Sequence, residues 1–66
     1  MSSLEKIRND ILDNALPHVA FDGWSWRTLI MAAKDTGIEE INLKRAFPKG
    51  PRDMVIYFNK MAGVNL

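Results

Sequence analysis

The sequence has no cysteine, so neither a disulfide nor a thiolate metal site can stabilise this chain. It is also short: a chain of 66 residues buries only about 60% of the surface that it exposes when unfolded. Its stability is therefore expected to come from helix packing, or from contacts with further parts of a longer protein.

An excess of charge of either sign is also missing, because nine Lys and Arg residues are balanced by eight Asp and Glu residues. Dedicated DNA-binding domains are usually more basic, since neutralisation of phosphates supplies much of their affinity. No apolar run approaches the roughly 18 residues that span a bilayer. The N-terminus lacks the apolar region of a signal peptide and the arginines of a transit peptide. We therefore expect a cytoplasmic protein.

What the sequence does contain is helical periodicity, without any strand alternation. A first helix is predicted to begin at a capping box, in which Ser2 and Glu5 each satisfy a free backbone amide of the other residue. Apolar residues follow at helical spacing from Leu4 to Val19. Pro17 lacks an amide and is expected to end or kink this helix.

Three further helices are predicted after the Asp22-Gly23 turn. Ser25 is the predicted N-cap of a helix over residues 26–34, with Leu29, Ile30 and Ala33 facing inward. A third helix is expected over residues 39–46, burying Leu43, Ala46 and Phe47. Pro48-Lys49-Gly50-Pro51 then breaks the chain before a fourth helix that starts at about Arg52. The sequence thus predicts an all-α fold, a small bundle of about four helices that forms a single domain over residues 1–66.

The second and third predicted helices carry the spacing of a helix-turn-helix. Small Ala33 allows the two helices to approach closely, and Gly37 supplies the positive φ angle of the turn. The pattern is completed by apolar residues that hold the third helix on the core: Ile38, Leu43 and Ala46. From about Ile7 to Phe58 the chain resembles the N-terminal domain of TetR-type proteins.

A narrower resemblance rests on three segments: Ala15-Leu16-Pro17-His18-Val19, Phe21-Asp22-Gly23-Trp24-Ser25 and Phe47-Pro48-x-Gly50. Together they resemble the N-terminal region of the ubiquinone-biosynthesis accessory (Coq-nine) family. The resemblance implies a TetR-like fold turned from gene regulation to the binding of isoprenoid lipids. It also implies support for the di-iron demethoxyubiquinone hydroxylase that acts late in ubiquinone synthesis.

Members of that family are considerably longer than this chain, and their lipid pocket, membrane-binding helix and hydroxylase-binding surface lie in C-terminal helices. The resemblance therefore implies that residues 1–66 are the N-terminal part of a longer protein, without its lipid-binding helices. The partners implied are the remainder of that chain and, for the full-length protein, isoprenoid quinone precursors and the hydroxylase. The missing part would also bring the protein to the membrane periphery. No lipid-contacting residue is assigned within these residues.

The alternative is a TetR-type, sequence-specific DNA-binding regulator. Its third helix would enter the major groove, with Asn42, Lys44, Arg45 and Lys49 as the DNA-facing residues. The leading end of that helix carries Glu39 and Glu40, which would face the phosphates. We favour an ordinary solvated face for the basic residues, so DNA is not expected as a partner.

No catalytic, cofactor or metal site is predicted, and the chain is not expected to be an enzyme. His18 is the single histidine, and with no cysteine and no second histidine it has no set of metal partners. It is expected to bind a backbone carbonyl or to face water. Asp10 and Asp13 lie three residues apart on a polar helix face, which is routine and does not define an acid–base pair.

A third interpretation is a protein-interaction module. Its surface would dock a partner, the rest of the chain or a second copy in a homo-oligomer, through Trp26, Met54, Phe58 and Met61. At helical spacing, methionines are more often core residues, and Trp24 is expected in the core. For Trp26 the sequence favours neither the core nor the surface.

Overall fold

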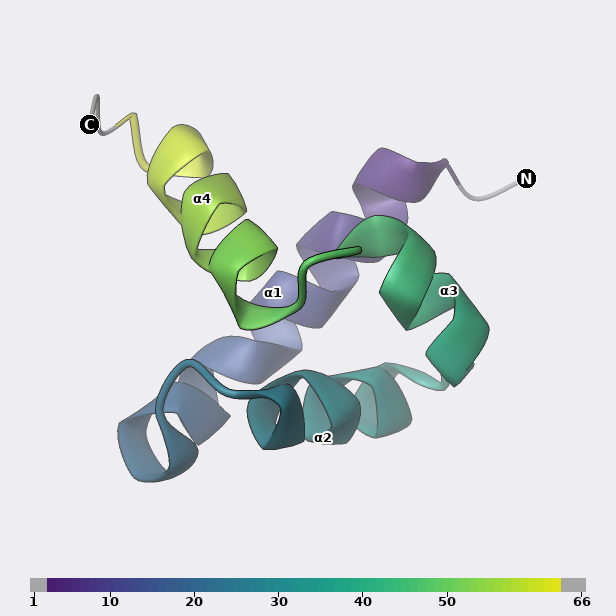
Figure 1. Cartoon of the computed structure of the whole chain (residues 1–66), viewed down its shortest axis with the longest axis horizontal. Coiled ribbons are helices and arrows are strands. Elements are labelled where there is room, and N and C mark those ends of the chain that lie inside the picture. The colour runs from purple at the N-terminus through teal and green to yellow at the C-terminus, as the bar shows by residue number, and fades with distance from the viewer. Residues whose placement is uncertain (1–2, 64–66) are drawn as a thin grey trace.

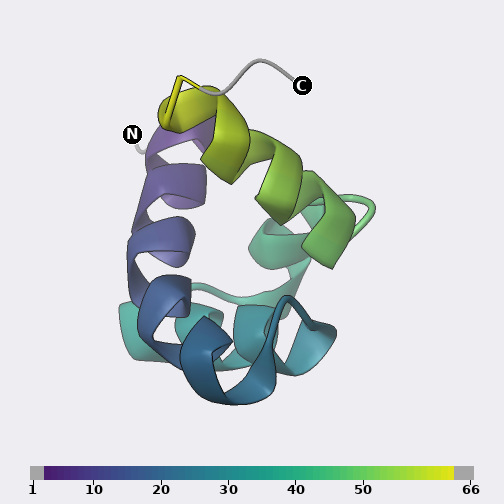
Figure 2. The same ribbon diagram turned by 90° about the vertical axis from the view of Figure 1, so that its left-hand side faces the viewer.

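The computed structural model describes residues 3–63, which form four α-helices. They are α1 (Leu4–Asp22), α2 (Trp26–Thr36), α3 (Glu40–Ala46) and α4 (Pro51–Met61). The longest helix, α1, packs against both α2 and α3. Figure 1 shows α3 and α4 towards opposite sides of the view, and the turned view in Figure 2 shows α4 at the top of the molecule and α2 at its foot. The predicted all-α fold of about four helices is confirmed for these residues. None of the four helices is both long enough and apolar enough to cross a membrane.

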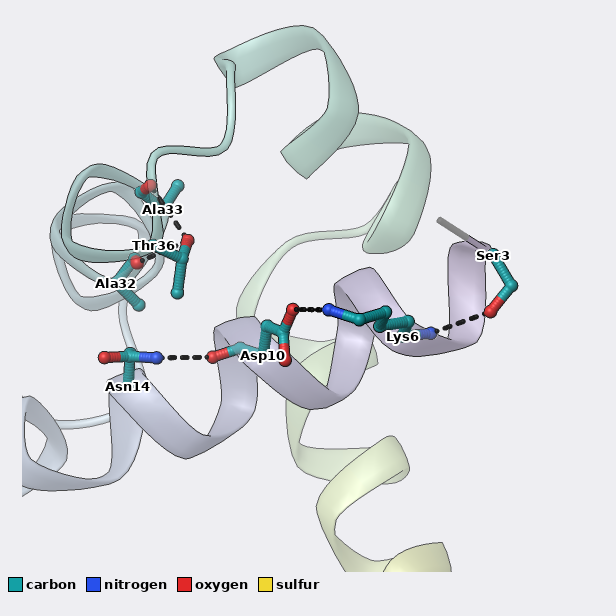
Figure 3. Close-up of polar contacts among 7 residues, drawn as sticks. All are labelled: Ser3, Lys6, Asp10, Asn14, Ala32, Ala33 and Thr36. Atoms are coloured by element: carbon teal, nitrogen blue, oxygen red, sulfur yellow. Dashed lines mark hydrogen bonds and ion pairs between the residues drawn. The ribbon is translucent and has the colours of Figure 1, made fainter. Parts of the chain in front are cut away.

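The start of α1 is fixed by Ser3, whose Oγ accepts a hydrogen bond from the Lys6 amide at 3.1 Å (Figure 3). This satisfies one of the amides that the first turn leaves free. The predicted cap, Ser2, lies outside the described residues, and Ser3 caps the helix instead. One turn later Lys6 Nζ lies 3.0 Å from Asp10 Oδ2, an exposed pair whose contribution is about 0.3–0.5 kcal/mol (Figure 3).

Pro17 was predicted to end or kink the first helix. It does not end the helix, because α1 continues through it to Asp22. Proline cannot donate to the carbonyl of Asp13, four residues earlier. Both residues are exposed, so water can bind that carbonyl and the helix can continue. α1 ends instead at Gly23, where φ is 68° and the amide donates to the Val19 carbonyl at 2.9 Å.

The hydrophobic core lies where the four helices meet. Its buried apolar side chains come from every helix and from the residue after α3: Ile11, Leu12, Ala15, Leu29, Ala32, Ala33, Leu43, Ala46, Phe47 and Met54. The predicted inward positions of the second and third helices are confirmed, with one exception. Ile30 is 38% exposed, because α2 turns its other side inward and buries Ala32 in its place.

The start of α2 holds the one buried polar side chain among the described residues, that of Thr28. Its Oγ1 donates to the Gly23 carbonyl at 2.6 Å, so the hydroxyl is satisfied inside the core. The Thr28 amide donates to Ser25 Oγ at 3.3 Å, which confirms the predicted N-cap. The turn after α1 is thereby tied to the first turn of α2.

The connection between α2 and α3 is a three-residue turn that begins at Gly37. This glycine is left-handed, with φ 74° and ψ 20°, as its position after the helix predicted. The amide of Gly37 donates to the Lys34 carbonyl at 3.1 Å, and the amide of Ile38 donates to the Ala33 carbonyl at 2.8 Å. This is the bond pattern of a Schellman motif. Figure 3 shows the Thr36 hydroxyl bonded to the last-turn carbonyls, which further secures the end of α2.

In the turn before α4, the side chain of Trp26 packs on Gly50. Gly50 is buried, with φ 70°, and a Cβ atom there would lie 2.5 Å from Trp26 Cζ2. Only glycine therefore fits at this position. α4 begins at Pro51, one residue before the predicted start, because proline is well suited to the first position of a helix.

Candidate functional site

Two surfaces are candidates for a binding role. One is the outer face of α3, and the other is the surface predicted around the fourth helix, formed by Trp26, Met54, Phe58 and Met61. The α3 outer face consists of Glu40, Ile41, Lys44 and Arg45, all of which are exposed, and the exposed N-cap residue Glu39 precedes the helix. The acidic residues stand at the start of α3 and the basic residues in its last turn. Each sign of charge lies at the helix end where the macrodipole favours it. In Figure 1 this helix lies at the right-hand edge of the molecule.

One ion pair crosses the α3 outer face, between Lys44 Nζ and Glu40 Oε1 at 3.6 Å. Both side chains are well exposed, so the pair contributes at most a few tenths of a kcal/mol. Among the described residues, Glu39 and Arg45 take part in no ion pair, and the Glu39 side chain makes no capping hydrogen bond to α3. These two charges remain open to an outside group.

The four residues predicted to face DNA do not share one surface. Lys44 and Arg45 lie on the α3 outer face, whereas Asn42 is half-buried and lines a hollow beside α1 together with Arg45. Lys49 lies beyond the end of α3, in the turn before α4. Its amide donates to Asp53 Oδ2 at 2.7 Å, which ties that turn to the first turn of α4.

The sequence analysis overlooked Ile41, which lies at the centre of the α3 outer face and is 64% exposed. A helix turns about 100° per residue, so Ile41 lies about 200° away from buried Leu43. That spacing was a sufficient signal to place it outward.

The surface predicted around the fourth helix is only partly exposed. Trp26 is 43% exposed and Met61 54% exposed, so both can be reached from outside. Met54, in the first turn of α4, is fully buried. The prediction that it belongs to a binding surface is therefore wrong, and the prediction that it is a core residue is confirmed. Phe58 is half-buried because its ring packs on Trp24, with 5.4 Å between ring centroids. Trp24 thus joins the core, as predicted.

A surface hollow of about 250 Å³ lies between α4 and the turn after α3, and its lining includes Tyr57 and, from α1, Arg8. The Tyr57 hydroxyl donates to Asn9 Oδ1, and Arg8 Nε donates to the Ala46 carbonyl at 2.9 Å. Desolvation by burial is the main reason that the pKa of Tyr57 is raised above its ordinary 10.0, followed by the nearby carboxylate of Glu5. These contacts join α1 to α4 and to the end of α3.

The single histidine joins two helices, since His18 Nε2 of α1 lies 2.8 Å from Asp35 Oδ2 of α2. The prediction that it would bind a carbonyl or face water is therefore wrong. His18 reaches Asp35 from within α1, because the helix continues past Pro17 and His18 to Asp22. Within residues 3–63, no group of three His, Asp or Glu side chains is placed to hold a metal ion.

These features describe a small helical domain whose described residues include exposed surfaces that another molecule can contact. No family model matches the chain, and no solved structure matches it. It is similar to the ubiquinone biosynthesis protein COQ9, mitochondrial, of Drosophila melanogaster. The two are 32% identical over 65 residues, which is 98% of this chain and 20% of the fly protein.

This similarity confirms the predicted resemblance in its broader form, a likeness to a ubiquinone-biosynthesis protein. The chain spans about a fifth of the length of that relative. The TetR-like assignment and the binding of lipid or DNA stay predictions.

Proposed function

We propose that this chain is the helix-turn-helix-type N-terminal domain of a non-catalytic accessory protein in ubiquinone biosynthesis. The observation that carries the proposal is the 32% identity to the fly ubiquinone biosynthesis protein over nearly the whole chain. The order of α2, the Gly37 turn and α3 supports the helix-turn-helix part of the proposal. The role of this domain is to complete the fold of the protein, without chemistry of its own.

The segments that resemble the family support a structural role, because several of their residues make contacts between helices or fill the core. Gly23 accepts the bond from buried Thr28, and Trp24 packs on Phe58. Phe47 fills the core, and Gly50 receives the indole of Trp26. Residues that join helices are constrained by packing whether or not the domain binds a ligand.

Phe21 lies in one of these segments and is 89% exposed at the end of α1. No contact within the described core holds it. In the proposed full-length protein, this ring is covered by another part of the chain. Isoprenoid quinone precursors and the demethoxyubiquinone hydroxylase are then bound by parts of the protein outside residues 1–66.

The proposal is tested in cells whose gene for this chain is disrupted, with ubiquinone content measured by mass spectrometry. The intact gene should restore ubiquinone, whereas a gene lacking the codons for residues 1–66 should not. Phe47→Asp should fail like the deletion and lower the amount of soluble protein, since it places a charge in the core. The matched control is Lys44→Ala with Arg45→Ala, which leaves the core intact and should restore ubiquinone.

Normal ubiquinone content without residues 1–66 would contradict the structural role. A second measurement addresses the lipid-binding part of the proposal: organic extracts of the full-length gene product, purified from its host under mild conditions. Isoprenoid quinones or their precursors should be enriched above a mock purification. An extract without such enrichment would remove the support for lipid binding.

A further inference from the structure

We propose that the hollow between α4 and the turn after α3, named here the α4 hollow, binds a small organic anion: a carboxylate on a compact apolar body. Its lining combines two cations and one carboxylate with apolar and aromatic walls: Arg8, Lys60, Asp53, Pro48, Ile56 and Tyr57. The volume of about 250 Å³ is slightly below the usual range of small-molecule sites, so the ligand is smaller than a typical drug. This site is independent of the structural role proposed above, and either can fail without the other.

The guanidinium of Arg8 is held in place through one of its nitrogens. Its Nε donates to the Ala46 carbonyl at 2.9 Å, which ties the group to the end of α3 beside the α4 hollow. Arg8 is half-buried, and within residues 3–63 its two terminal nitrogens make no hydrogen bond and no ion pair. Two parallel N–H donors at the end of a guanidinium match the two oxygens of a carboxylate. The bond to Ala46 therefore leaves available the part of Arg8 that binds a carboxylate.

Lys60, in the last turn of α4, supplies the second positive charge of the lining. It belongs to no ion pair in the part of the chain that the structure describes. The carboxylate of Asp53 opposes these two cations, but its Oδ2 already accepts a hydrogen bond from the Lys49 amide at 2.7 Å. Two positive charges and one negative charge leave the lining with a formal charge of +1. This charge suits a ligand that carries a single negative charge.

The walls of the α4 hollow suit the apolar body of such a ligand. Ile56 is 55% exposed, and Pro48 is also exposed. The Tyr57 hydroxyl already donates to Asn9, so its ring serves as a wall and its proton is not needed for the ligand. A ligand that covers Ile56 removes apolar surface from water, which favours binding. An apolar carboxylate should therefore bind more tightly than acetate or inorganic phosphate, which leave this surface exposed.

Binding is expected to be weak, because the ligand is small and part of the lining remains in contact with solvent. With benzoate as the probe, we expect a dissociation constant on the order of 1 mM at low salt. Benzamide has nearly the same shape without the charge, and it should bind at least about tenfold more weakly. Phenyl phosphate carries more negative charge than the lining neutralises, so it should bind no more tightly than benzoate does.

The test is an NMR titration of the whole chain with benzoate, which follows the backbone amides and the Nε–H of Arg8. The largest shifts should come from Arg8, Ile56 and Lys60. Arg8→Gln should weaken binding at least about tenfold, because it removes the guanidinium. Lys60→Gln should weaken it about two- to fivefold, because this charge is exposed. Asp53→Asn should tighten binding about two- to fivefold, since it removes the opposing charge while its amide oxygen can still accept from Lys49.

Two control variants make the same changes of net charge outside the α4 hollow. Arg52→Gln removes an exposed positive charge from α4, and Glu39→Gln removes an exposed negative charge at the start of α3. Neither residue lines the hollow, so both variants should bind benzoate as the unmodified chain does. Arg8→Gln also removes the bond to Ala46, so its fold is checked by circular dichroism. Tighter binding by Asp53→Asn cannot result from unfolding, and this variant therefore tests the site whatever happens to Arg8→Gln.

Four outcomes would overturn the proposal. The first is the absence of any shift at the α4 hollow up to about 50 mM benzoate, far above the expected constant. The second is benzamide that binds as tightly as benzoate, because the cations would then recognise nothing. The third is an effect of Lys60→Gln or Asp53→Asn no larger than that of its control, which would reduce the effect to net charge. The fourth is phenyl phosphate that binds more than about tenfold tighter than benzoate, since the ligand would then be a phosphate ester.

Discussion

The indole of Trp26 lies directly on Gly50, where a Cβ atom would come within 2.5 Å of Cζ2 and 2.6 Å of Cε2. Trp26 is the first residue of α2, and Gly50 immediately precedes α4. The contact therefore fixes the start of one helix against the start of another. It also explains how a tryptophan can remain 43% exposed and still have a structural role.

Gly50→Ala should lower the free energy of unfolding by roughly 2–4 kcal/mol. The substitution combines an unfavourable positive φ with a clash against the Trp26 ring. The measurement is urea denaturation, followed by circular dichroism. Gly37→Ala is the control, because its φ is also positive but no atom lies within 4 Å of the new methyl group. It should cost about 1 kcal/mol, and equal losses for the two variants would show that the contact with Trp26 is unimportant.

Pro17→Ala should stabilise the chain by about 1–3 kcal/mol. Pro17 is exposed and lies inside α1, where an alanine can restore the hydrogen bond to the Asp13 carbonyl without any clash. Thermal and urea denaturation would measure the gain. Ala20→Pro, also exposed in α1, is the opposite change and should be strongly destabilising. A loss of stability on Pro17→Ala would indicate that the proline has a favourable role in the native helix.

Stability should fall as the pH rises above about 10, because of Tyr57. Burial and the carboxylates of Glu5 and Asp13 raise the pKa of its phenol above 10.0, while Arg8 lowers it by less. The unfolded chain then loses this proton at a lower pH than the folded chain does. The stabilisation is therefore fully present below pH 10 and is lost as the pH rises through the folded pKa.

Tyr57 is the single tyrosine, so its titration can be followed directly by ultraviolet absorbance. The folded chain should titrate at a higher pH than the same chain in urea. Tyr57→Phe should remove this part of the pH dependence and cost about 1 kcal/mol at neutral pH, through the lost bond to Asn9. Identical titration curves for folded and unfolded chains would contradict the effect of burial.

DNA binding, the alternative function, should be weak and insensitive to the residues predicted for it. Glu39 and Glu40 stand at the leading end of α3, and Lys44 already pairs with Glu40. A fluorescence titration with duplex DNA, repeated at several salt concentrations, measures this directly. Steep salt dependence that disappears in Lys44→Ala and Arg45→Ala would revive the DNA-binding interpretation.

Local sequence signals determined most of the helix boundaries. Ser25 caps α2, Gly37 adopts the left-handed turn, and Pro51 starts α4, because each depends on the preferences of a few neighbouring residues. The spacing of Leu43 and Ala46 likewise fixed the inner face of α3. The same spacing implied that Ile41 points outward, although the sequence analysis did not use it.

Tertiary structure decided the features that depend on whether another helix or solvent covers a residue. Pro17 stays inside α1 because its side of the helix faces solvent, and Met54 is buried because the other helices close over it. His18 reaches Asp35, and Trp26 reaches Gly50, only after α1, α2 and α4 have packed. Periodicity shows which residues share a face of a helix. It does not show which of those faces another helix will cover, because the covering is set by packing between segments far apart in the chain.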